Sequence, residues 1–286
     1  MYDAIVIGAG PAGISASLYL KRANKNVLVL YHGKSELERA HKIDNFYGFD
    51  GGISGIDLYN KGINQAKTLG IDVIDNEVLS IQMNENMEYN VKTTDNLYSS
   101  KVIILATGNK KLKPNIIGVE EFEGKGISYC AICDGFFYRK KTVVVIGSGK
   151  YAISEAEELL NVTSDVKILT NGLEMEKETS IPVDKRKISC IYGDTKVSGI
   201  EFLDGEKLET KGVFIAIGEA GGADFAKKLG IMMKNDTIIV DSDMRTNVPG
   251  VYACGNLVGG LLQINKACYE GAKAGLDAIK YLKRGK

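Results

Sequence analysis

Cysteine and histidine are scarce in this chain, which limits the metal and disulfide chemistry that it can support. The 286 residues include five cysteines and two histidines. Five irregularly spaced cysteines are too few for the disulfide framework of a secreted protein and are typical of a reducing cytoplasm. A four-ligand zinc site needs a second pair of cysteines or histidines, but these residues are isolated in the sequence. We therefore expect no metal site from Cys190, Cys254, Cys268, His32 and His41.

A net charge and long apolar runs are also missing. Basic and acidic residues number 36 each, so the formal net charge is zero, and no global basic field attracts nucleic acid. No uninterrupted apolar run approaches the roughly 20 residues that span a bilayer. The N-terminus carries Asp3 and lacks basic residues before its apolar run, unlike a secretory signal. We expect a soluble, cytoplasmic protein with no nucleic-acid or membrane partner.

Proline is rare and glycine is abundant. Only four prolines accompany 33 glycines, and 44% of the residues are hydrophobic. This composition favours an ordered chain with many tight turns over a disordered one. The length is sufficient for two hydrophobic cores, and usual domain sizes favour two domains over one.

The N-terminal segment has the pattern of a dinucleotide-binding βαβ unit. A β-branched run over 1–7 ends in the glycine turn GAGPAG at 8–13, a helix-like stretch follows, and a second strand covers 27–31. Glycines at this spacing allow a tight turn and close approach of a pyrophosphate to a helix N-terminus. The second strand ends in Tyr31 and His32 rather than in the usual acidic ribose ligand, and His32 can equally be plain surface. We predict a dinucleotide site at this turn.

The first unit continues with a helix and a group of strands. Ser54 is a candidate N-cap for an amphipathic helix that ends near residue 69. Short alternating runs between 71 and 98 predict a β-meander, and a buried strand over 101–106 closes the unit.

The same order of elements then begins again. A strand over 142–146, a glycine turn at 147–152 and a helix over 153–160 precede another strand at 166–169. The chain thus looks internally duplicated. A long helix over 263–283, which carries small residues, closes the chain and is expected to pack on the first unit.

Two polar stretches, 109–125 and 241–250, are predicted to be linkers. The expected fold class is α/β, with two Rossmann-like (three-layer ββα) dinucleotide-binding domains, the second inserted in the first. We place the first domain at residues 1–111 and 243–286 and the inserted domain at 112–242.

The inserted unit carries the sequence CAICD at 130–134. Two cysteines separated by two residues can close a small disulfide ring, and a lowered thiol pKa makes one sulfur of such a pair a good nucleophile. Asp134 adds an ionisable group beside the pair. The motif alone also fits half of a zinc site or two small buried residues, although the missing second ligand pair argues against zinc.

The chain resembles low-molecular-weight thioredoxin reductases over nearly its whole length. The most specific match is SYCAICDGFFY at 128–138. The other matching stretches are 8–13, 44–48, 52–55, 106–108, 244–255 and Gln263. The resemblance implies FAD on the first domain, a smaller NADPH domain that bears the cysteines, a homodimer, and rotation of one domain against the other.

The resemblance also implies roles for individual residues. Cys133 would be the sulfur beside the flavin, Cys130 would attack the disulfide of thioredoxin, and Asp134 would be the acid/base. Asn45 and Gln263 would approach the isoalloxazine, and Asn256 stands where the family usually has aspartate. The implied cofactor contacts are Gly8, Gly10, Pro11, Ala12, Gly13, Tyr31, His32, Asn45, Val78, Ala106, Thr107, Gly108, Gly255, Asn256, Gln263 and Ile264.

Departures from the family pattern cluster at the nucleotide site. Lys150 and Tyr151 replace small or polar residues of the second glycine turn, and Ser154 with Glu155 replaces a pair of glutamates. Residues 169–172, LTNG, lack the histidine and arginines that pair with the 2′-phosphate of NADPH. The following chain is short, and Leu262 stands where an arginine is expected. The flavin and cysteine motifs are complete, so another electron donor is expected.

This combination resembles the ferredoxin-dependent flavin thioredoxin reductases, and we expect electrons to pass from ferredoxin through FAD to thioredoxin. An acidic ferredoxin would need a basic patch. The alternatives are a conventional reductase that uses NADPH or NADH, and a flavin-binding redox sensor. The candidate basic clusters are Lys110, Lys111 and Lys113, and Arg139, Lys140 and Lys141.

Overall fold

The computed structural model describes residues 1–108, 114–234 and 237–284. Contacts divide the chain into two compact units: unit 1 is Met1–Lys110 with Gly221–Lys286, and unit 2 is Lys111–Ala220. The second unit is thus inserted in the first, as expected. Its C-terminal boundary lies at Ala220, however, and not at residue 242.

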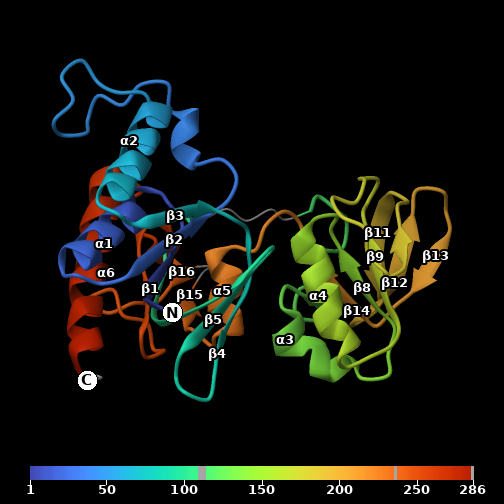
Figure 1. Ribbon diagram of the computed structural model, residues 1–286. Coiled ribbons are helices and arrows are strands. Elements are labelled where there is room, and N and C mark those ends of the chain that lie inside the picture. Colours follow the sequence, from blue (N-terminus) through green and yellow to red (C-terminus); the bar gives the residue numbers. More distant parts are fainter. Residues whose placement is uncertain (109–113, 235–236, 285–286) are drawn as a thin grey trace. The chain divides into compact units, whose positions relative to one another are not determined.

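Unit 1 is built on a seven-stranded mixed sheet (Figure 1). Its strands are β1 (Tyr2–Ile7), β2 (Val27–Tyr31), β3 (Asp72–Asp75), β4 (Val78–Met83), β5 (Tyr89–Thr93), β6 (Leu97–Leu105) and β17 (Val251–Ala253). They run in the order β3-β2-β1-β6-β5-β4, and β17 pairs with β6. The long strand β6 pairs with β5 in antiparallel fashion near its start and with β17 in parallel fashion near its end. The glycine turn after β1 therefore lies at the edge where several parallel strands end.

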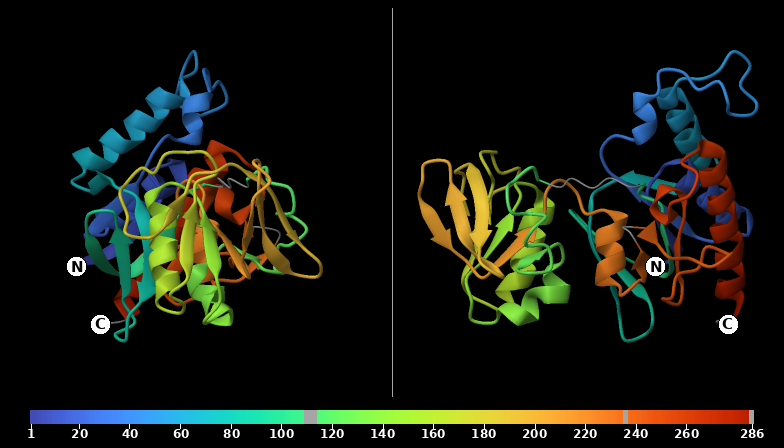
Figure 2. Two further views of the ribbon diagram at one scale, coloured as in Figure 1. Left: turned by 90° about the vertical axis from the view of Figure 1, so that its right-hand side faces the viewer. Right: turned by 180° about the vertical axis from the view of Figure 1, so that it is seen from behind.

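Helices α1 (Pro11–Arg22) and α6 (Ile264–Arg284) pack side by side in unit 1 (Figures 1 and 2). Small residues allow this approach, because a Cβ atom added to Gly271 would lie 2.0 Å from the carbonyl oxygen of Ala12. Ser54 caps the next helix by accepting the Asp57 N–H, which confirms that prediction. The remaining elements of unit 1 are α2 (Gly55–Thr68), α5 (Gly222–Lys228), η1 (Glu36–Arg39), η3 (Gly255–Val258), β15 (Met233–Lys234) and β16 (Thr237–Ile238).

Unit 2 contains a five-stranded parallel sheet and a three-stranded antiparallel sheet. The parallel strands, in spatial order, are β10 (Val183–Asp184), β9 (Val166–Leu169), β8 (Val143–Ile146), β14 (Gly212–Ile215) and β7 (Ile127–Ser128). The antiparallel strands are β11 (Ile188–Gly193), β12 (Val197–Phe202) and β13 (Lys207–Glu209). The helical elements are α3 (Ala131–Asp134), η2 (Gly135–Tyr138) and α4 (Lys150–Leu160).

The side chains of β8 alternate between two apolar clusters of unit 2. Val143 and Val145 pack with α4, whereas Val144 and Ile146 pack with residues of the antiparallel sheet such as Phe202. Figures 1 and 2 show α3 and α4 on one side of the parallel sheet and the antiparallel sheet on the other. Three layers result, and the expected α/β class with two Rossmann-like units is confirmed.

The first predicted linker is more ordered than the sequence suggested, and the chain re-enters unit 1 earlier than expected. In the described part of 109–125, Ile116, Val119 and Phe122 are buried in the core of unit 2. After Ala220 the chain returns to unit 1 at once, because Phe225 and Ala226 of α5 are buried there. A polar composition concealed these few apolar anchors.

Candidate functional site

The first glycine turn is open at one glycine and closed at two. A Cβ atom on Gly8 would lie 2.3 Å from the Ala106 carbonyl oxygen, and one on Gly13 would lie 1.9 Å from the carbonyl oxygen of Gly8. At Gly10, by contrast, no atom of the described residues lies within 4 Å of such a Cβ. Pro11 is the first residue of α1, where its missing N–H costs nothing. The backbone beside Gly10 is therefore accessible to a ligand.

Other predicted residues meet this turn at the same edge of the sheet. The Gly8 N–H donates to Leu30 O, at the end of the neighbouring strand β2. A Cβ atom on Gly255, which has φ +75°, would lie 3.1 Å from the Cβ of Ala12. The Thr107 hydroxyl accepts the Gly222 N–H at 3.0 Å and thus ties Ala106–Gly108 to the start of α5.

A largely buried ion pair fixes the turn at Gly255. Glu270 accepts the Gly255 N–H at 2.9 Å, and the Lys266 ammonium donates to the Gly255 carbonyl at 2.9 Å. Lys266 also donates to the Gly259 carbonyl and lies 3.0 Å from the Glu270 carboxylate. Both side chains lie on α6, four residues apart. The closing helix therefore sets the conformation of a predicted cofactor-binding turn.

Asn45 and Gln263, predicted to approach the isoalloxazine, lie together. The Asn45 amide donates to Gln263 Oε1 at 3.3 Å although the residues are 218 positions apart in the sequence. Ile264 follows as the first residue of α6, and Asn256 lies in η3. The structure thus gathers this part of the predicted set in unit 1.

Three further residues of the predicted cofactor set, His32, Tyr31 and Val78, lie in other surroundings. His32 Nδ1 lies 2.8 Å from Asp75 Oδ1 at the end of β3. The Tyr31 ring packs edge-on against Tyr59, and burial raises the pKa of both phenols. Val78 is a buried residue of β4, which β5 and β6 separate from β1 in the sheet.

These features fit a dinucleotide. Backbone N–H groups at the start of α1 and the uncovered face of Gly10 suit a pyrophosphate. The side chains of Asn45, Gln263 and Asn256 supply amide donors and acceptors suited to a flavin ring and its ribityl hydroxyls.

The second glycine turn has the same backbone plan but is covered. A Cβ atom on Gly149 would lie 3.1 Å from Glu176 Oε2, so the carboxylate sits over this glycine. The Glu176 N–H donates to Ser148 O at 3.0 Å and holds the loop in place. Tyr151, only 2% exposed, is the second residue of α4 and packs in the apolar core of unit 2.

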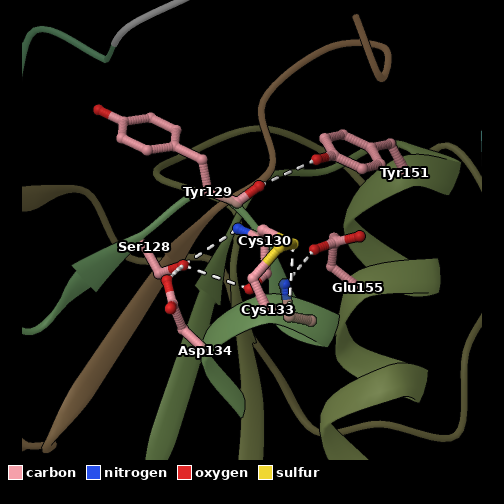
Figure 3. The surroundings of a disulfide bond; sticks show 8 residues. Ser128, Tyr129, Cys130, Cys133, Asp134, Tyr151 and Glu155 are labelled. Carbon is pink, nitrogen blue, oxygen red and sulfur yellow. Dashed lines mark hydrogen bonds between the residues drawn. A yellow bond between two sulfur atoms is a disulfide. The ribbon is translucent and has the colours of Figure 1, made fainter. Parts of the chain in front are cut away.

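The redox cysteines lie in unit 2 at the carboxyl end of β7. A disulfide joins Cys130 and Cys133 (Figure 3). Cys130 is 2% exposed and is the N-cap of α3, where its Sγ accepts the Cys133 N–H at 3.1 Å. Cys133 is exposed. One sulfur is thus open to attack, while the other rests against a backbone donor.

Ser128 connects this disulfide to the predicted acid. Its hydroxyl donates to Asp134 Oδ2 at 2.6 Å and accepts the Cys130 N–H at 3.1 Å. Burial, together with the nearby Asp134 charge, raises the pKa of Tyr138. Figure 3 shows Ser128 between Asp134 and the backbone of Cys130. Asp134 is therefore held beside the cysteine pair by one hydroxyl.

Helix α4 reaches the opposite side of the same turn. Glu155, 1% exposed, accepts the Ala131 N–H at 2.8 Å. One helical turn earlier, the Tyr151 hydroxyl donates to Tyr129 O at 3.4 Å. The helix that follows the covered glycine turn thus contacts the residues on both sides of Cys130 (Figure 3).

Cys254 is a packing residue of unit 1. It is fully buried in the apolar core beneath α1 and α6, and burial raises the pKa of its thiol well above the ordinary range, so the thiol is protonated. Among the described residues, no group of three or more histidines, cysteines or acids is arranged to hold a metal. No described helix combines the length and apolar character needed to cross a membrane.

Three contributors to these sites were missed in the sequence. Lys266 and Glu270 carry an i,i+4 spacing that marks a helical ion pair, and this signal was available. Glu176 carried no local signal, because it reaches the second turn through a loop that sequence patterns do not place.

Comparisons with known proteins agree with this arrangement. Residues 2–271 match the family model described as pyridine nucleotide-disulphide oxidoreductase. The chain is 34% identical to the thioredoxin reductase of Aquifex aeolicus, over 99% of this chain and 94% of that protein.

Two solved structures extend the similarity to three dimensions. The atypical thioredoxin reductase from Desulfovibrio vulgaris Hildenborough is 39% identical, with a TM-score of 0.95 and 99% of both chains covered. A ferredoxin-flavin thioredoxin reductase from Clostridium acetobutylicum is 31% identical, with a TM-score of 0.73 and coverage of 99% and 98%. The chain therefore belongs to the thioredoxin reductase family of pyridine nucleotide-disulphide oxidoreductases.

Proposed function

We propose that this thioredoxin reductase binds FAD in unit 1 and takes its electrons from reduced ferredoxin, not from NADPH or NADH. The Cys130–Cys133 pair passes them to thioredoxin. The observation that carries the choice of donor is the covered second glycine turn. Glu176 places a carboxylate where a pyrophosphate would approach Gly149, and two negative groups repel each other at that distance.

Two cations near β9 and β10, the part of unit 2 that would bind the 2′-phosphate of NADPH, are already paired with acids of the same unit. Lys185 pairs with Glu174, and Arg186 pairs with Asp184 and Asp204. Charge-assisted contacts to a phosphate are worth about 1.5–3 kcal/mol each. Losing two of them weakens binding by about two to four powers of ten.

The similarity to a ferredoxin-flavin thioredoxin reductase supports the donor, and the energetics permit it. Low-potential ferredoxins lie near about −400 mV and thioredoxin near about −270 mV. The difference of about 130 mV favours two-electron transfer by about 6 kcal/mol. Two one-electron donors can therefore drive the reduction of one disulfide.

FAD bound in unit 1 would supply the chemistry that joins one-electron donors to the two-electron reduction of the disulfide. The residues that would hold it are those of the first glycine turn, the Gly255 turn, and the Asn45–Gln263 pair. Exposed Cys133 is the sulfur open to attack, and the S–S bond then breaks toward Cys130. Cys130 leaves as a thiolate that keeps its bond from the Cys133 N–H, and Asp134 supplies or accepts the proton of the dithiol. The Cys130 sulfur then attacks the disulfide of thioredoxin.

The docking surface for an acidic ferredoxin follows from charge. Arg139, Lys140 and Lys141 are exposed on unit 2, and the Arg139 guanidinium lies over the Phe136 ring. Lys110, Lys111 and Lys113 lie outside the described residues.

On the basis of the family resemblance, we also propose that the enzyme is a cytoplasmic homodimer.

Anaerobic titration of the purified protein tests the donor. We expect neither NADPH nor NADH to bleach the visible absorbance of the flavin within seconds, whereas reduced ferredoxin bleaches it. Rapid bleaching by either nucleotide would identify a conventional reductase. Thioredoxin reduction under steady-state conditions separates an enzyme from a redox sensor, and Cys133→Ser is expected to abolish it while FAD stays bound.

A further inference from the structure

Glu155 is a buried acid beside the disulfide that the scheme above does not use. It belongs to α4 and is 1% exposed, and its Oε2 accepts the Ala131 N–H at 2.8 Å. Figure 3 shows its side chain pointing at the turn that carries Cys130 and Cys133. Burying a carboxylate costs free energy, because desolvation disfavours its charged form.

The Glu155 carboxylate and the Cys130 sulfur use donors of the same helical turn. Glu155 takes the N–H of Ala131, the first residue of α3, and Cys130 Sγ takes the N–H of Cys133, two residues later. The rise between these residues is only about 3 Å. A thiolate on Cys130 would therefore form close to an existing negative charge, in surroundings that screen it poorly.

The other acid of the site acts on the opposite side. Asp134 is held by the Ser128 hydroxyl, which also binds the Cys130 N–H. Tyr151 binds the backbone of Tyr129 without adding charge. Glu155 is thus the charged contact that α4 makes with this turn.

We infer that Glu155 is a positioning residue that lowers the reduction potential of the Cys130–Cys133 pair. Reduction breaks the S–S bond, adds two electrons and one proton, and leaves one thiol and one thiolate. The Glu155 charge opposes the thiolate product on Cys130, so the dithiol form gives up its electrons more readily. The pair is then a stronger reductant toward thioredoxin. The inference rests on the redox role of the pair and does not depend on the electron donor.

Glu155→Gln tests the charge while it keeps an oxygen that can accept the Ala131 N–H. The holoenzyme is equilibrated with dithiothreitol buffers of defined ratio, and the Cys130 and Cys133 thiols are counted by alkylation and mass spectrometry. We expect the equilibrium to shift about tenfold toward the dithiol, since a nearby charge changes a pKa by one unit or more. Tenfold corresponds to about 30 mV.

Glu157→Gln is the matched control, because Glu157 is an exposed acid on the same helix. It removes the same charge from α4 and is expected to leave the equilibrium unchanged. Tyr151→Phe removes an uncharged hydrogen bond to the turn and is expected to do the same. An unchanged equilibrium in Glu155→Gln, or equal shifts in Glu155→Gln and Glu157→Gln, overturns the inference.

Ala131→Pro is a second variant, and we expect it to shift the dithiol–disulfide equilibrium in the opposite direction. Proline is compatible with the first helical position, and Cys130 already has the extended backbone that precedes proline. The substitution removes the N–H that offsets the Glu155 charge, so the equilibrium should shift toward the disulfide. A shift toward the dithiol would mean that the hydrogen bond, and not the charge, sets the potential. Neither measurement uses ferredoxin, so a failure here is separate from a failure of the proposed donor.

Discussion

The two glycine turns have one backbone plan and opposite surroundings. In each, a buried parallel strand ends in a glycine turn and a helix begins. No atom of the described residues lies within 4 Å of a Cβ built on Gly10, whereas the carboxylate of Glu176 lies 3.1 Å from one built on Gly149. The first turn can receive a ligand, and the second is filled by the chain itself.

The difference teaches that two turns with one backbone plan can differ in how their glycines are covered. Helix α4 still starts at the turn, but Tyr151 and Glu155 now contact the backbone beside Cys130. The sheet keeps its core, with Val143–Ile146 almost fully buried. Unit 2 thus positions the disulfide through contacts from α4.

The largest effect is expected from Gly10→Val. The added side chain meets open space and the backbone φ is −72°, so the fold should survive, but a pyrophosphate can no longer approach. Losing two hydrogen bonds to a charged group costs about two to four powers of ten in affinity. Flavin content after purification and thioredoxin reduction should both fall by at least about 100-fold.

Far-ultraviolet circular dichroism is the control for that variant. An unchanged spectrum with lost flavin assigns the effect to the ligand. Full flavin content in Gly10→Val would place the cofactor elsewhere and remove the contrast between the two turns.

Asp134→Asn is expected to have the next largest effect. Its side chain keeps the shape that meets Ser128 but can no longer carry the proton of the dithiol. General acid-base catalysis contributes about 10²–10⁴-fold, so thioredoxin reduction should fall about 100-fold while flavin binding is unchanged.

Ser128→Ala separates positioning from proton transfer. It keeps the acid but removes the 2.6 Å hydrogen bond that holds it. We expect a loss of about tenfold, since one such bond is worth about 1.5 kcal/mol. Full activity in Asp134→Asn would exclude the carboxylate as the acid.

A smaller effect is expected when the Gly255 turn loses its anchor. Lys266→Met removes the donor to two carbonyl groups and leaves Glu270, a mostly buried acid, without its cation. Leaving buried polar groups unpaired costs about 1–3 kcal/mol, which corresponds to about tenfold in flavin affinity. Flavin fluorescence on dilution measures it, and Lys283→Met, at an exposed position of the same helix, should have no effect.

Local sequence patterns predicted most of this architecture, because the apolar residues of strands and helices recur with a characteristic period. The strand predicted over 27–31 matches β2, and the helix predicted over 263–283 matches α6 to within one residue at each end. The boundary at Ala220 was missed because the apolar anchors of α5 are few.

The site residues that belong to a local sequence motif were predictable. The residues that reach the site from distant loops were not. Glycine spacing and the cysteine pair identified the residues around Gly10 and Cys130. The pairing of Asn45 with Gln263 needed the resemblance to a family. The position of Glu176 over Gly149 could not be predicted, because the loop that carries it has no periodic pattern.

The smallest effect is expected from Gly149→Val, the counterpart of Gly10→Val in the second turn. The glycine has φ −92°, which valine tolerates, and the nearest atoms belong to the end of the Glu176 side chain, which needs to shift by only a few tenths of an ångström. If no nucleotide binds there during turnover, the substitution blocks nothing. Thioredoxin reduction with reduced ferredoxin should stay within about twofold, the range of surface substitutions with effects near 0.5 kcal/mol. A loss comparable to that in Gly10→Val would show that the second turn still binds a ligand that the reaction needs.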